Sequence, residues 1–356
     1  PGGKLAQDVV MESPGPRFSE VFQKISSHEE PSPALIRAAF DAILCGAWTA
    51  SQIAGLMVAL RMRGESAGVI TAVAESFRAS MVKVEHGFDR LLDTCGTGGD
   101  AKGTLNLSTG AAILAAAAGV PVAKHGNRAV SSQAGSADVV EALGIPVDLT
   151  AAGAGAVLKQ VGIGFLFAPT HHPAMRHAAV ARKELGIRSI FNCLGPLVNP
   201  ARPNYQLVGA YDDGLRNVMA EVLRSLGTAR AWIVRGTDGL DEVSPCAPTR
   251  VTELSGSSIA EMVVAPNDFG VAALAESDIV GGSPAENARA LELVLSGEPH
   301  PATDAFVLNG AAALVVALEL EPRRAAERVR EALASGAAKK TLESWRSEAV
   351  RARQSG

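Results

Sequence analysis

The sequence predicts an α/β protein with a small N-terminal helical domain and a larger α/β domain, whose mainly parallel central sheet is flanked by helices. From about residue 90, short apolar runs alternate with helical segments, which is the pattern of a parallel sheet covered on both faces. Residues 33–82, by contrast, have helical patterns alone. Alanine and glycine are abundant, and aromatic residues make up only 4% of the 356-residue chain, which suits close packing of helices on a sheet.

The N-terminal part divides into a lead-in and a helical domain. Residues 1–32 are mixed and polar, so we expect a loosely ordered lead-in. Residues 33–84 form the expected helical domain, in which Thr49 and Gln52 make a capping box. Its three expected helices are 34–44, 49–63 and 65–81. Helices this short bury little surface alone, so we expect them to pack on the rest of the chain or on a second subunit.

The remaining residues, 85–356, form the expected α/β domain. Its expected strands are 91–94, 120–123, 164–167, 206–210, 230–235, 250–254 and 261–264. Its expected helices are 107–119, 136–143, 151–161, 214–226, 284–296, 303–320, 322–335 and 338–353. One further helix, 171–186, is rich in histidine and arginine and is expected to contribute to the helical domain.

Charge and cysteine usage limit the classes of partner and compartment. A formal net charge of −4 provides no overall attraction to nucleic acid or to an anionic membrane, so we expect neither partner. Four scattered cysteines without metal-ligand spacing suit a reducing compartment. No apolar run is long enough to span a membrane, and the first residues lack the apolar core of a secretory signal. We therefore expect a cytoplasmic protein.

A glycine-rich loop at 95–100 lies between an expected strand and the helix that begins near Asn106. Such a loop directs backbone N–H groups and a helix dipole at a phosphate, and its glycines allow close approach. The loop lacks the Lys-Ser/Thr ending of a P-loop, and it matches the dinucleotide fingerprint only in part because Ala101 replaces the third glycine. A dinucleotide site is therefore the minority interpretation, and a tight turn without a ligand is an equal alternative for the loop alone.

Two more expected strands end in polar loops. Residues 124–132 supply two cations, an amide and two hydroxyls, which is a dense set of anion ligands. After the strand at 230–235, Asp241 and Glu242 supply the hard oxygen ligands that magnesium needs when it also holds a phosphate. The alternatives are a solvated basic turn and a solvated acidic loop. Proteins with parallel sheets bind ligands at the carboxyl ends of the strands, so these loops and the glycine-rich loop are expected to form one shared site.

The histidine-rich helix gives a fourth candidate. Its histidines, His171, His172 and His177, lack the i,i+4 pairing of a zinc helix, so a substrate-facing or structural role is preferred. Arg182 could hold a carboxylate in a bidentate fork, against the alternative of a plain surface arginine. No local signature of a Ser-His-Asp or Cys-His nucleophile is present, so no residue is assigned as acid, base or nucleophile.

Together these segments resemble anthranilate phosphoribosyltransferases, over about residues 33–353. The motifs that carry the resemblance are 96–100, 106–109, 124–128, 171–177, 192–200 and 239–242. The resemblance implies transfer of the phosphoribosyl group from 5-phosphoribosyl-1-pyrophosphate (PRPP) to the amine of anthranilate. The products would be N-(5-phosphoribosyl)anthranilate and pyrophosphate, in the second step from chorismate to L-tryptophan. It also implies a pair of Mg²⁺ ions in each subunit and a homodimer formed through the helical domain.

The resemblance also implies roles for individual residues. Those that would hold PRPP are Gly96, Gly99, Asp100, Thr104, Asn106, Leu107, Ser108, Thr109, Lys124, His125, Gly126, Asn127, Arg128, Ala129, Val130, Ser131, Ser132 and Ser136. Those that would contact anthranilate are Gly96, His125, Asn127, His171, Arg176 and Arg182, with Arg182 at its carboxylate. Those that would bind magnesium are Ser108, Asp241 and Glu242. Cys193 departs from the apolar residue expected at its position, which we expect to change packing only.

Two other functions are alternatives for this sequence. A pyrimidine nucleoside phosphorylase would share the architecture, and phosphorolysis of thymidine or uridine would identify it. A non-enzymatic relative that binds nucleic acid would need a basic groove, which the net charge of −4 does not favour.

Overall fold

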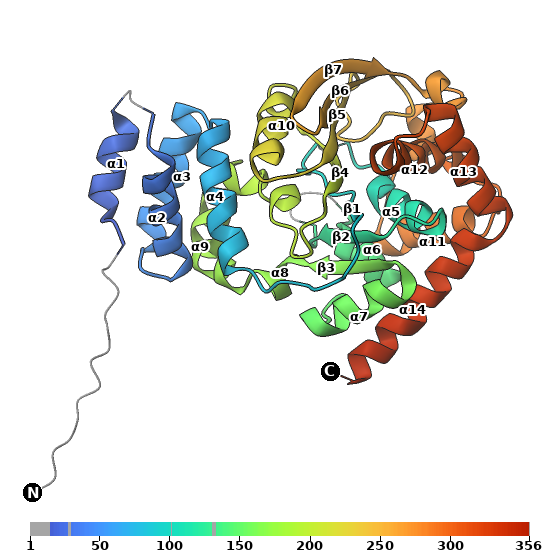
Figure 1. The fold of residues 1–356 in the computed structure, drawn as a ribbon, viewed down its shortest axis with the longest axis horizontal. Helices are drawn as coiled ribbons and strands as arrows, with labels where there is room; N and C mark the ends of the chain where they lie inside the picture. Colours follow the sequence, from blue (N-terminus) through green and yellow to red (C-terminus); the bar gives the residue numbers. More distant parts are fainter. Residues whose placement is uncertain (1–14, 28–29, 101, 130–132, 356) are drawn as a thin grey trace, which may run out of the picture.

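The computed structural model describes residues 15–27, 30–100, 102–129 and 133–355, which form a helical body and a larger α/β body (Figure 1). The helical body contains α1 (Phe18–Ser26), α2 (Pro33–Leu44), α3 (Ala50–Arg63) and α4 (Ala67–Ser80), and α9 (Arg176–Leu185) packs on α2 and α3. The expected capping box is present: Thr49 Oγ1 accepts the N–H of Gln52, and the Gln52 side chain accepts the N–H of Thr49.

Helix α1 corrects the expectation of a loosely ordered lead-in, which is wrong for residues 18–26. Val21 and Ile25 are buried against the helical body. The ring of Phe18 meets Trp48 edge-on, with ring centroids 5.5 Å apart. Large apolar residues recur at helical spacing here among polar ones, so the segment is a short amphipathic helix.

The α/β body is built on one seven-stranded sheet with the order β3-β2-β1-β4-β5-β6-β7. All seven expected strands are present: β1 (Leu92–Asp93), β2 (Val122–Gly126), β3 (Ile163–Phe167), β4 (Tyr205–Gly209), β5 (Arg230–Gly236), β6 (Thr249–Ser255) and β7 (Ser258–Val264). The first five are parallel, and β6 and β7 extend the β5 edge as an antiparallel hairpin. The predicted fold class is therefore confirmed.

Helices cover both faces of this sheet (Figure 1). They are α5 (Leu107–Ala117), α6 (Ser136–Ala142), α7 (Ala151–Val161), α10 (Leu215–Ser225), α11 (Pro284–Leu295), α12 (Thr303–Leu318), α13 (Pro322–Ala334) and α14 (Ala337–Ser355). Helix α12 is buried along almost its whole length and packs on α5 and β4. No single helix within the described residues is long and apolar enough to cross a membrane; α12 and α13 meet the criterion only as a pair bent by 116°.

The single helix expected over 171–186 is interrupted, which corrects that prediction. Helix α8 (Ala168–His171) ends, a 3-10 turn (Pro173–Met175) follows, and α9 begins at Arg176. His172 leaves the helical region at φ −124° and ψ 60°. The cause is Pro173, because proline disfavours a helical conformation in the residue before it and has no N–H to donate. The two histidines therefore lie on a different element from Arg176 and Arg182.

The strand order places the polar loops together. Successive strands run outward from β1 in one direction and from β4 in the other, so the order reverses between these two neighbours. A crevice outside the carboxyl ends of the strands at such a point is where open α/β sheets bind ligands. The glycine-rich loop leaves β1 here, and the segment around Tyr211 leaves β4 beside it.

Candidate active site

The glycine-rich loop is packed against the end of β4. The N–H of Thr97 donates to the carbonyl of Gly209 at 2.8 Å, and the N–H of Tyr211 donates to Thr97 Oγ1 at 3.0 Å. A Cβ on Gly209 would collide with the backbone carbonyl of Asp241, so only glycine allows the loops after β4 and β5 to meet. Gly99 has φ +87°, a conformation that glycine adopts without strain.

A buried polar cluster lies under this loop. Lys124 is 1% exposed, and its Nζ donates to the carbonyl of Thr94 at 2.8 Å and to Ser108 Oγ at 3.3 Å. Asp93 accepts the N–H of His125 at 3.2 Å and Asn199 Nδ2 at 2.8 Å. Burial raises the pKa of Asp93 to about 6, against the opposing charge of Lys124. Lys124 thus connects the end of β1 to α5 beneath the glycine-rich loop. The polar segment 124–132 did not predict that this lysine is buried.

The first turn of α5 is engaged with its surroundings. Asn106 Nδ2 donates to the carbonyl of Ala134 at 3.2 Å, and Asn106 Oδ1 accepts from Asn287 at 2.9 Å. The N–H of Ser108 donates to Glu242 Oε1 at 3.1 Å. Thr109 Oγ1 is buried and has no hydrogen-bond partner within the described residues. Asn287, which the sequence analysis missed, comes from α11 and has no signal in the local motif.

Three carboxylates gather where the loops after β1 and β5 meet. Burial raises the pKa of Glu242 to about 7; the charge of Lys124 opposes this rise and that of Asp100 adds to it. Burial, followed by the charges of Asp100 and Glu242, also raises the pKa of Asp241 well above its usual value. Neither Asp241 nor Glu242 has enough compensating positive charge for its carboxylate. The arrangement therefore fits a divalent cation, which would relieve this repulsion.

The protein ligands alone would not complete such a site. Within the described residues, no group of three or more His, Cys, Asp or Glu side chains is already placed to surround a metal. Magnesium commonly takes one or two carboxylates together with substrate phosphates and water. The residues present therefore suit magnesium that arrives with a phosphorylated ligand.

The loop after β2 is folded back on α6. A Cβ on Gly135 would collide with the backbone at Arg128–Ala129, so this glycine permits the turn. Asp138 accepts the N–H groups of Ala129 and Gly135, both at 2.9 Å. The Arg128 guanidinium pairs with Asp138 at 3.1 Å and with Glu141, which directs it toward α6.

Two further expected site residues flank this loop, Gly126 at the end of β2 and Ser136 at the start of α6. Ser136 Oγ is 3.4 Å from the carbonyl of Asn127. A Cβ on Gly126 would collide with Ser136 Oγ and the ring of Phe165. The expected PRPP contacts Val130, Ser131 and Ser132 lie outside the described residues.

Two buried histidines face each other beside the crevice. His125 Nδ1 lies 2.7 Å from the carbonyl of Gly195, and its ring centroid lies 5.2 Å from that of His172. Burial lowers the pKa of His125 to about 4 and that of His172 to about 3, so both are neutral near pH 7. His125 Nε2 and both ring nitrogens of His172 have no partner within the described residues. His171, which the sequence analysis singled out, instead lies 3.3 Å from the carbonyl of Val82.

Arg182 is available for an anion. It is half-buried, its Cζ lies 5.2 Å from the ring centre of Phe191, and burial lowers its pKa. It makes no ion pair with any residue that the structure describes. The segment from Phe191 to Gly195 connects it to His125. Arg176, in contrast, is exposed at the start of α9.

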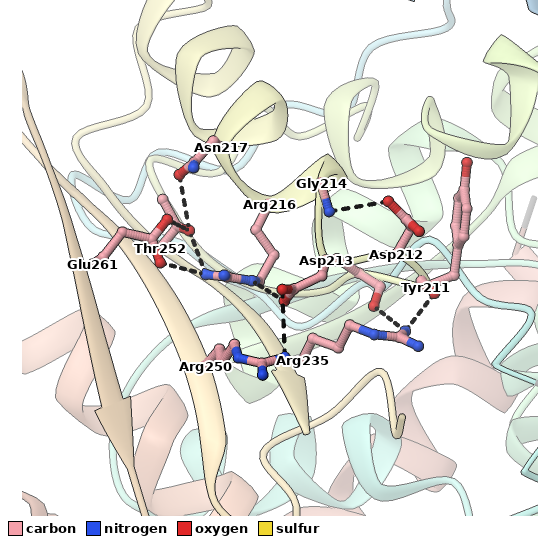
Figure 2. Close-up of polar contacts among 11 residues, drawn as sticks. Tyr211, Asp212, Asp213, Gly214, Arg216, Asn217, Arg235, Arg250, Thr252 and Glu261 are labelled. Atoms are coloured by element: carbon pink, nitrogen blue, oxygen red, sulfur yellow. Dashed lines mark hydrogen bonds and ion pairs between the residues drawn. The ribbon is translucent and has the colours of Figure 1, made fainter. Parts of the chain in front are cut away.

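Arg235 is a further residue of the site that the sequence analysis missed. Its guanidinium donates to the backbone carbonyls of Ala210, at 3.1 Å, and Tyr211 (Figure 2). Its charge also lowers the pKa of Asp241, against the larger effect of burial. Arg235 thus joins the ends of β4 and β5. Near it, Arg216 pairs with Asp213 at 2.9 Å and Glu261 at 2.8 Å, which ties α10 to the β6–β7 hairpin (Figure 2).

The chain matches two family descriptions that together cover both bodies. Residues 89–339 match the glycosyl transferase family, a/b domain, and residues 19–81 match the glycosyl transferase family, helical bundle domain. It is 44% identical over 327 residues to an anthranilate phosphoribosyltransferase of Symbiobacterium thermophilum, covering 92% of this chain and 96% of that one. It is 47% identical over 305 residues to one of Rhodospirillum rubrum, covering 85% and 88%.

Solved structures agree with this similarity. The anthranilate phosphoribosyltransferase of Thermus thermophilus superimposes with a TM-score of 0.87 at 38% identity, covering 92% of this chain and 99% of that chain. That of Saccharomyces cerevisiae, in complex with PRPP and Mg, gives a TM-score of 0.87 at 28% identity, covering 94% and 98%. The yeast enzyme is also solved with 4-fluoroanthranilate, at a TM-score of 0.85 and 25% identity.

Proposed function

Because this chain belongs to the anthranilate phosphoribosyltransferase family, we propose that it transfers the phosphoribosyl group of PRPP to the amine of anthranilate. The products are N-(5-phosphoribosyl)anthranilate and pyrophosphate, in L-tryptophan biosynthesis. One observation carries the proposal beyond the similarity. Three features meet where the strand order reverses between β1 and β4. They are the glycine-rich loop, the buried contact of Lys124 with Ser108, and the mutually repelling carboxylates of Asp241 and Glu242.

The donor subsite lies at the loop after β1 and the start of α5. Backbone N–H groups around Gly96, Gly99 and Asp100 bind the pyrophosphate of PRPP, and the α5 N-terminus adds its dipole. Lys124 acts from beneath, because its Nζ already holds Thr94 and Ser108. Residues from His125, at the end of β2, to Ala129, with Ser136 on α6, close the other side. The remaining contacts expected here are Thr104, Asn106, Leu107, Thr109, Val130, Ser131 and Ser132.

Asp241 and Glu242 would hold magnesium, with Ser108 and the pyrophosphate oxygens supplying further ligands. When bound, magnesium neutralises charge on the departing pyrophosphate. The neighbour solved with PRPP and Mg supports magnesium as the metal. Asp100 adds a third carboxylate, and a pair of Mg²⁺ ions in each subunit would also need the negative charge of the pyrophosphate.

The acceptor subsite lies between the loop after β2 and α9. Arg182 holds the anthranilate carboxylate, since its half-buried guanidinium has no carboxylate partner in the described structure. Gly96, His125 and Asn127 border the amine side. The other expected contacts are His171, which is buried beside Val82, and Arg176, which is exposed at the start of α9. The neutral rings of His125 and His172 provide a surface against the aromatic ring.

The chemistry then depends on position and charge. Cleavage of the bond to pyrophosphate leaves oxocarbenium-like character on the sugar carbon, as in glycoside cleavage. Fixed N–H donors stabilise the negative charge that grows on the leaving group. Arg182 holds the acceptor so that its amine faces the sugar carbon from the opposite side.

We assign the chain to a homodimer formed through the helical body. Several large apolar side chains are exposed on neighbouring helices there: Met62 on α3 is 83% exposed, Val180 on α9 is 53% exposed, and Ile187 follows α9 at 46%. Exposed apolar side chains on packed helices support this face as the interaction surface. Light scattering should give a dimer mass, and Val180→Glu should give a monomer. Free thiols at all four cysteines support a cytoplasmic location.

The function is tested by mixing the protein with anthranilate, PRPP and magnesium and following the loss of anthranilate fluorescence. Magnesium-dependent loss is expected. No loss from folded protein, with an active control enzyme in the same assay, would reject the proposal. Incubation with phosphate and thymidine or uridine tests the phosphorylase alternative, for which we expect no turnover.

A further inference from the structure

Arg188 reaches from the end of the helical body into the glycine-rich loop. It lies in the segment after α9, and its Nη2 donates to the carbonyl of Gly99. Its Cζ lies 4.2 Å from the ring centre of Tyr211, in the range of a cation–π contact. The side chain is half-buried and pairs with no carboxylate among the described residues. Arg188 therefore does not belong to an ordinary surface ion pair.

This contact determines the direction of a backbone donor. In a trans peptide the carbonyl and the following N–H point in opposite directions, and the described chain contains no cis peptide bond. Holding the carbonyl of Gly99 toward Arg188 therefore directs the N–H of Asp100 away from it. Gly99 has φ +87° and no side chain, so the loop itself provides little restraint on this peptide.

Tyr211 supports the same loop at two points. Its N–H donates to Thr97 Oγ1 at 3.0 Å, and its ring holds the guanidinium of Arg188 against Gly99. The peptide that follows carries Asp100, whose carboxylate lies 3.1 Å from the N–H of Lys102 and 3.5 Å from that of Asp241. The contact at Gly99 thus also affects how the glycine-rich loop meets the acidic loop.

We infer that Arg188, stacked on Tyr211, is a positioning residue that holds the Gly99 peptide so that the Asp100 N–H faces the pyrophosphate of PRPP. The inference rests on the proposed function. A planar guanidinium can stack face-on against the ring and donate in its plane at the same time, whereas an ammonium can lie over the ring but has no planar group to stack. The shape of Arg188, and not its charge alone, is therefore required.

The test compares Arg188→Ala and Arg188→Lys with the wild-type protein, and with Lys183→Ala as an exposed cation near the end of α9. We expect both Arg188 variants to raise the KM for PRPP about tenfold, with the KM for anthranilate changed less than about twofold. Lys183→Ala should behave as wild type. A near-normal PRPP KM in Arg188→Lys would overturn the inference, because charge alone would then suffice. Equal changes in both KM values would also overturn it, since that is the effect of general distortion.

Tyr211 variants provide an independent test. Tyr211→Phe keeps the ring face and should stay near the wild-type PRPP KM, whereas Tyr211→Leu should resemble Arg188→Ala. The double variant Arg188→Ala with Tyr211→Leu should be no worse than the more impaired single variant, because both remove one contact. Additive effects would contradict the proposed stacking.

Calorimetry of PRPP binding in the presence of magnesium separates this inference from the proposed function. Wild-type protein that binds PRPP but does not consume anthranilate would reject the proposed transfer reaction alone. The same titration with Arg188→Ala should show about tenfold weaker binding. Unchanged binding would reject the role of Arg188, and thermal melting of each variant confirms that it is folded.

Discussion

The carboxylate of Glu242 accepts the backbone N–H of Ser108 at 3.1 Å, which joins the acidic loop after β5 to the first turn of α5. The two residues belong to segments 134 positions apart in the chain. Burial raises the pKa of Glu242 to about 7, so this contact holds a carboxyl group whose charge is poorly compensated. The Glu242 carboxylate, whose ionised form a cation would stabilise, therefore lies beside the N-terminus of α5.

Replacing both acidic residues tests the metal site. Asp241→Asn with Glu242→Gln keeps the size of each side chain but removes its charge, so we expect turnover to fall by about 100-fold or more because magnesium and the donor bind poorly. Initial rates against magnesium concentration measure the effect. Normal turnover with the usual magnesium dependence would remove these residues from the metal site.

The raised pKa of Glu242 predicts that a neutral residue at this position lowers turnover but raises the stability of the protein. Its folded-state pKa of about 7 lies above its ordinary value of 4.5, so the native state binds this proton more tightly than the unfolded state. The free energy of unfolding therefore decreases as pH rises from about 4.5 to 7. Glu242→Gln should make the metal-free protein more stable at pH 8, by on the order of 1–2 kcal/mol, while lowering turnover.

Denaturant unfolding of wild type and Glu242→Gln at pH 5 and pH 8 measures this effect. The two proteins should differ little at pH 5 and more at pH 8. The magnesium requirement of the wild type should also increase as pH falls below about 7, because protonation competes with the metal. A variant less stable than wild type at pH 8 would contradict the buried-charge explanation.

Arg182→Ala should raise the KM for anthranilate by about tenfold to 100-fold, because a hydrogen-bonded charged contact contributes about 1.5–3 kcal/mol. The KM for PRPP should change little, since Arg182 contacts Phe191 and not the glycine-rich loop. Steady-state kinetics with each substrate varied in turn measure both values. An unchanged anthranilate KM would place the carboxylate elsewhere.

Lys124→Met should destabilise the protein more at high pH than at low pH. The charge of Lys124 lowers the pKa of both Asp93 and Glu242, against the larger effect of burial. Without it these carboxylates are buried without compensation, which costs about 3–5 kcal/mol when they are ionised. Below pH 5 both are protonated and the cost should shrink. Melting temperatures over this pH range decide the matter, and a pH-independent loss would point to packing alone.

Gly209→Ala should reduce both stability and magnesium-dependent turnover, because the new Cβ would collide with the carbonyl of Asp241. Overpacking of this kind costs about 1–3 kcal/mol. Gly68→Ala is the matched control, since a Cβ there meets nothing closer than 3.9 Å and alanine favours the helix. A Gly209→Ala protein with wild-type activity and stability would show that the loops after β4 and β5 can separate freely.

The sequence predicted the sheet well because most strands coincide with a short apolar run bounded by glycine or polar residues, whereas in β6 apolar residues are interspersed among polar ones. The sequence also predicted that the candidate ligand-binding residues lie at one edge of the sheet, because the carboxyl ends of parallel strands meet at the same edge. It failed at α1, where polar residues concealed an amphipathic repeat around Val21 and Ile25, and at Pro173, which divides the expected helix.

The sequence patterns did not predict contacts between residues that lie far apart in the chain. Nothing near Lys124 shows that its ammonium is buried under Thr94, and nothing near Arg188 or Arg235 indicates contacts with Gly99 or Tyr211. Each of these three side chains donates to at least one backbone carbonyl. A backbone carbonyl is present at every residue, so such a contact leaves no recognisable pair of residue types in the sequence.

The helical body is assembled from two stretches of chain, residues 18–80 and α9, with the first three strands of the sheet lying between them in sequence. No single cut of the polypeptide separates the two bodies into intact folding units. Removal of residues before 85 would expose the face of α9 that packs on α2 and α3, and with it the segment that carries Arg182 and Arg188. The helical body is thus a structural part of the binding crevice, and we expect the two bodies to unfold in one cooperative transition rather than as independent modules.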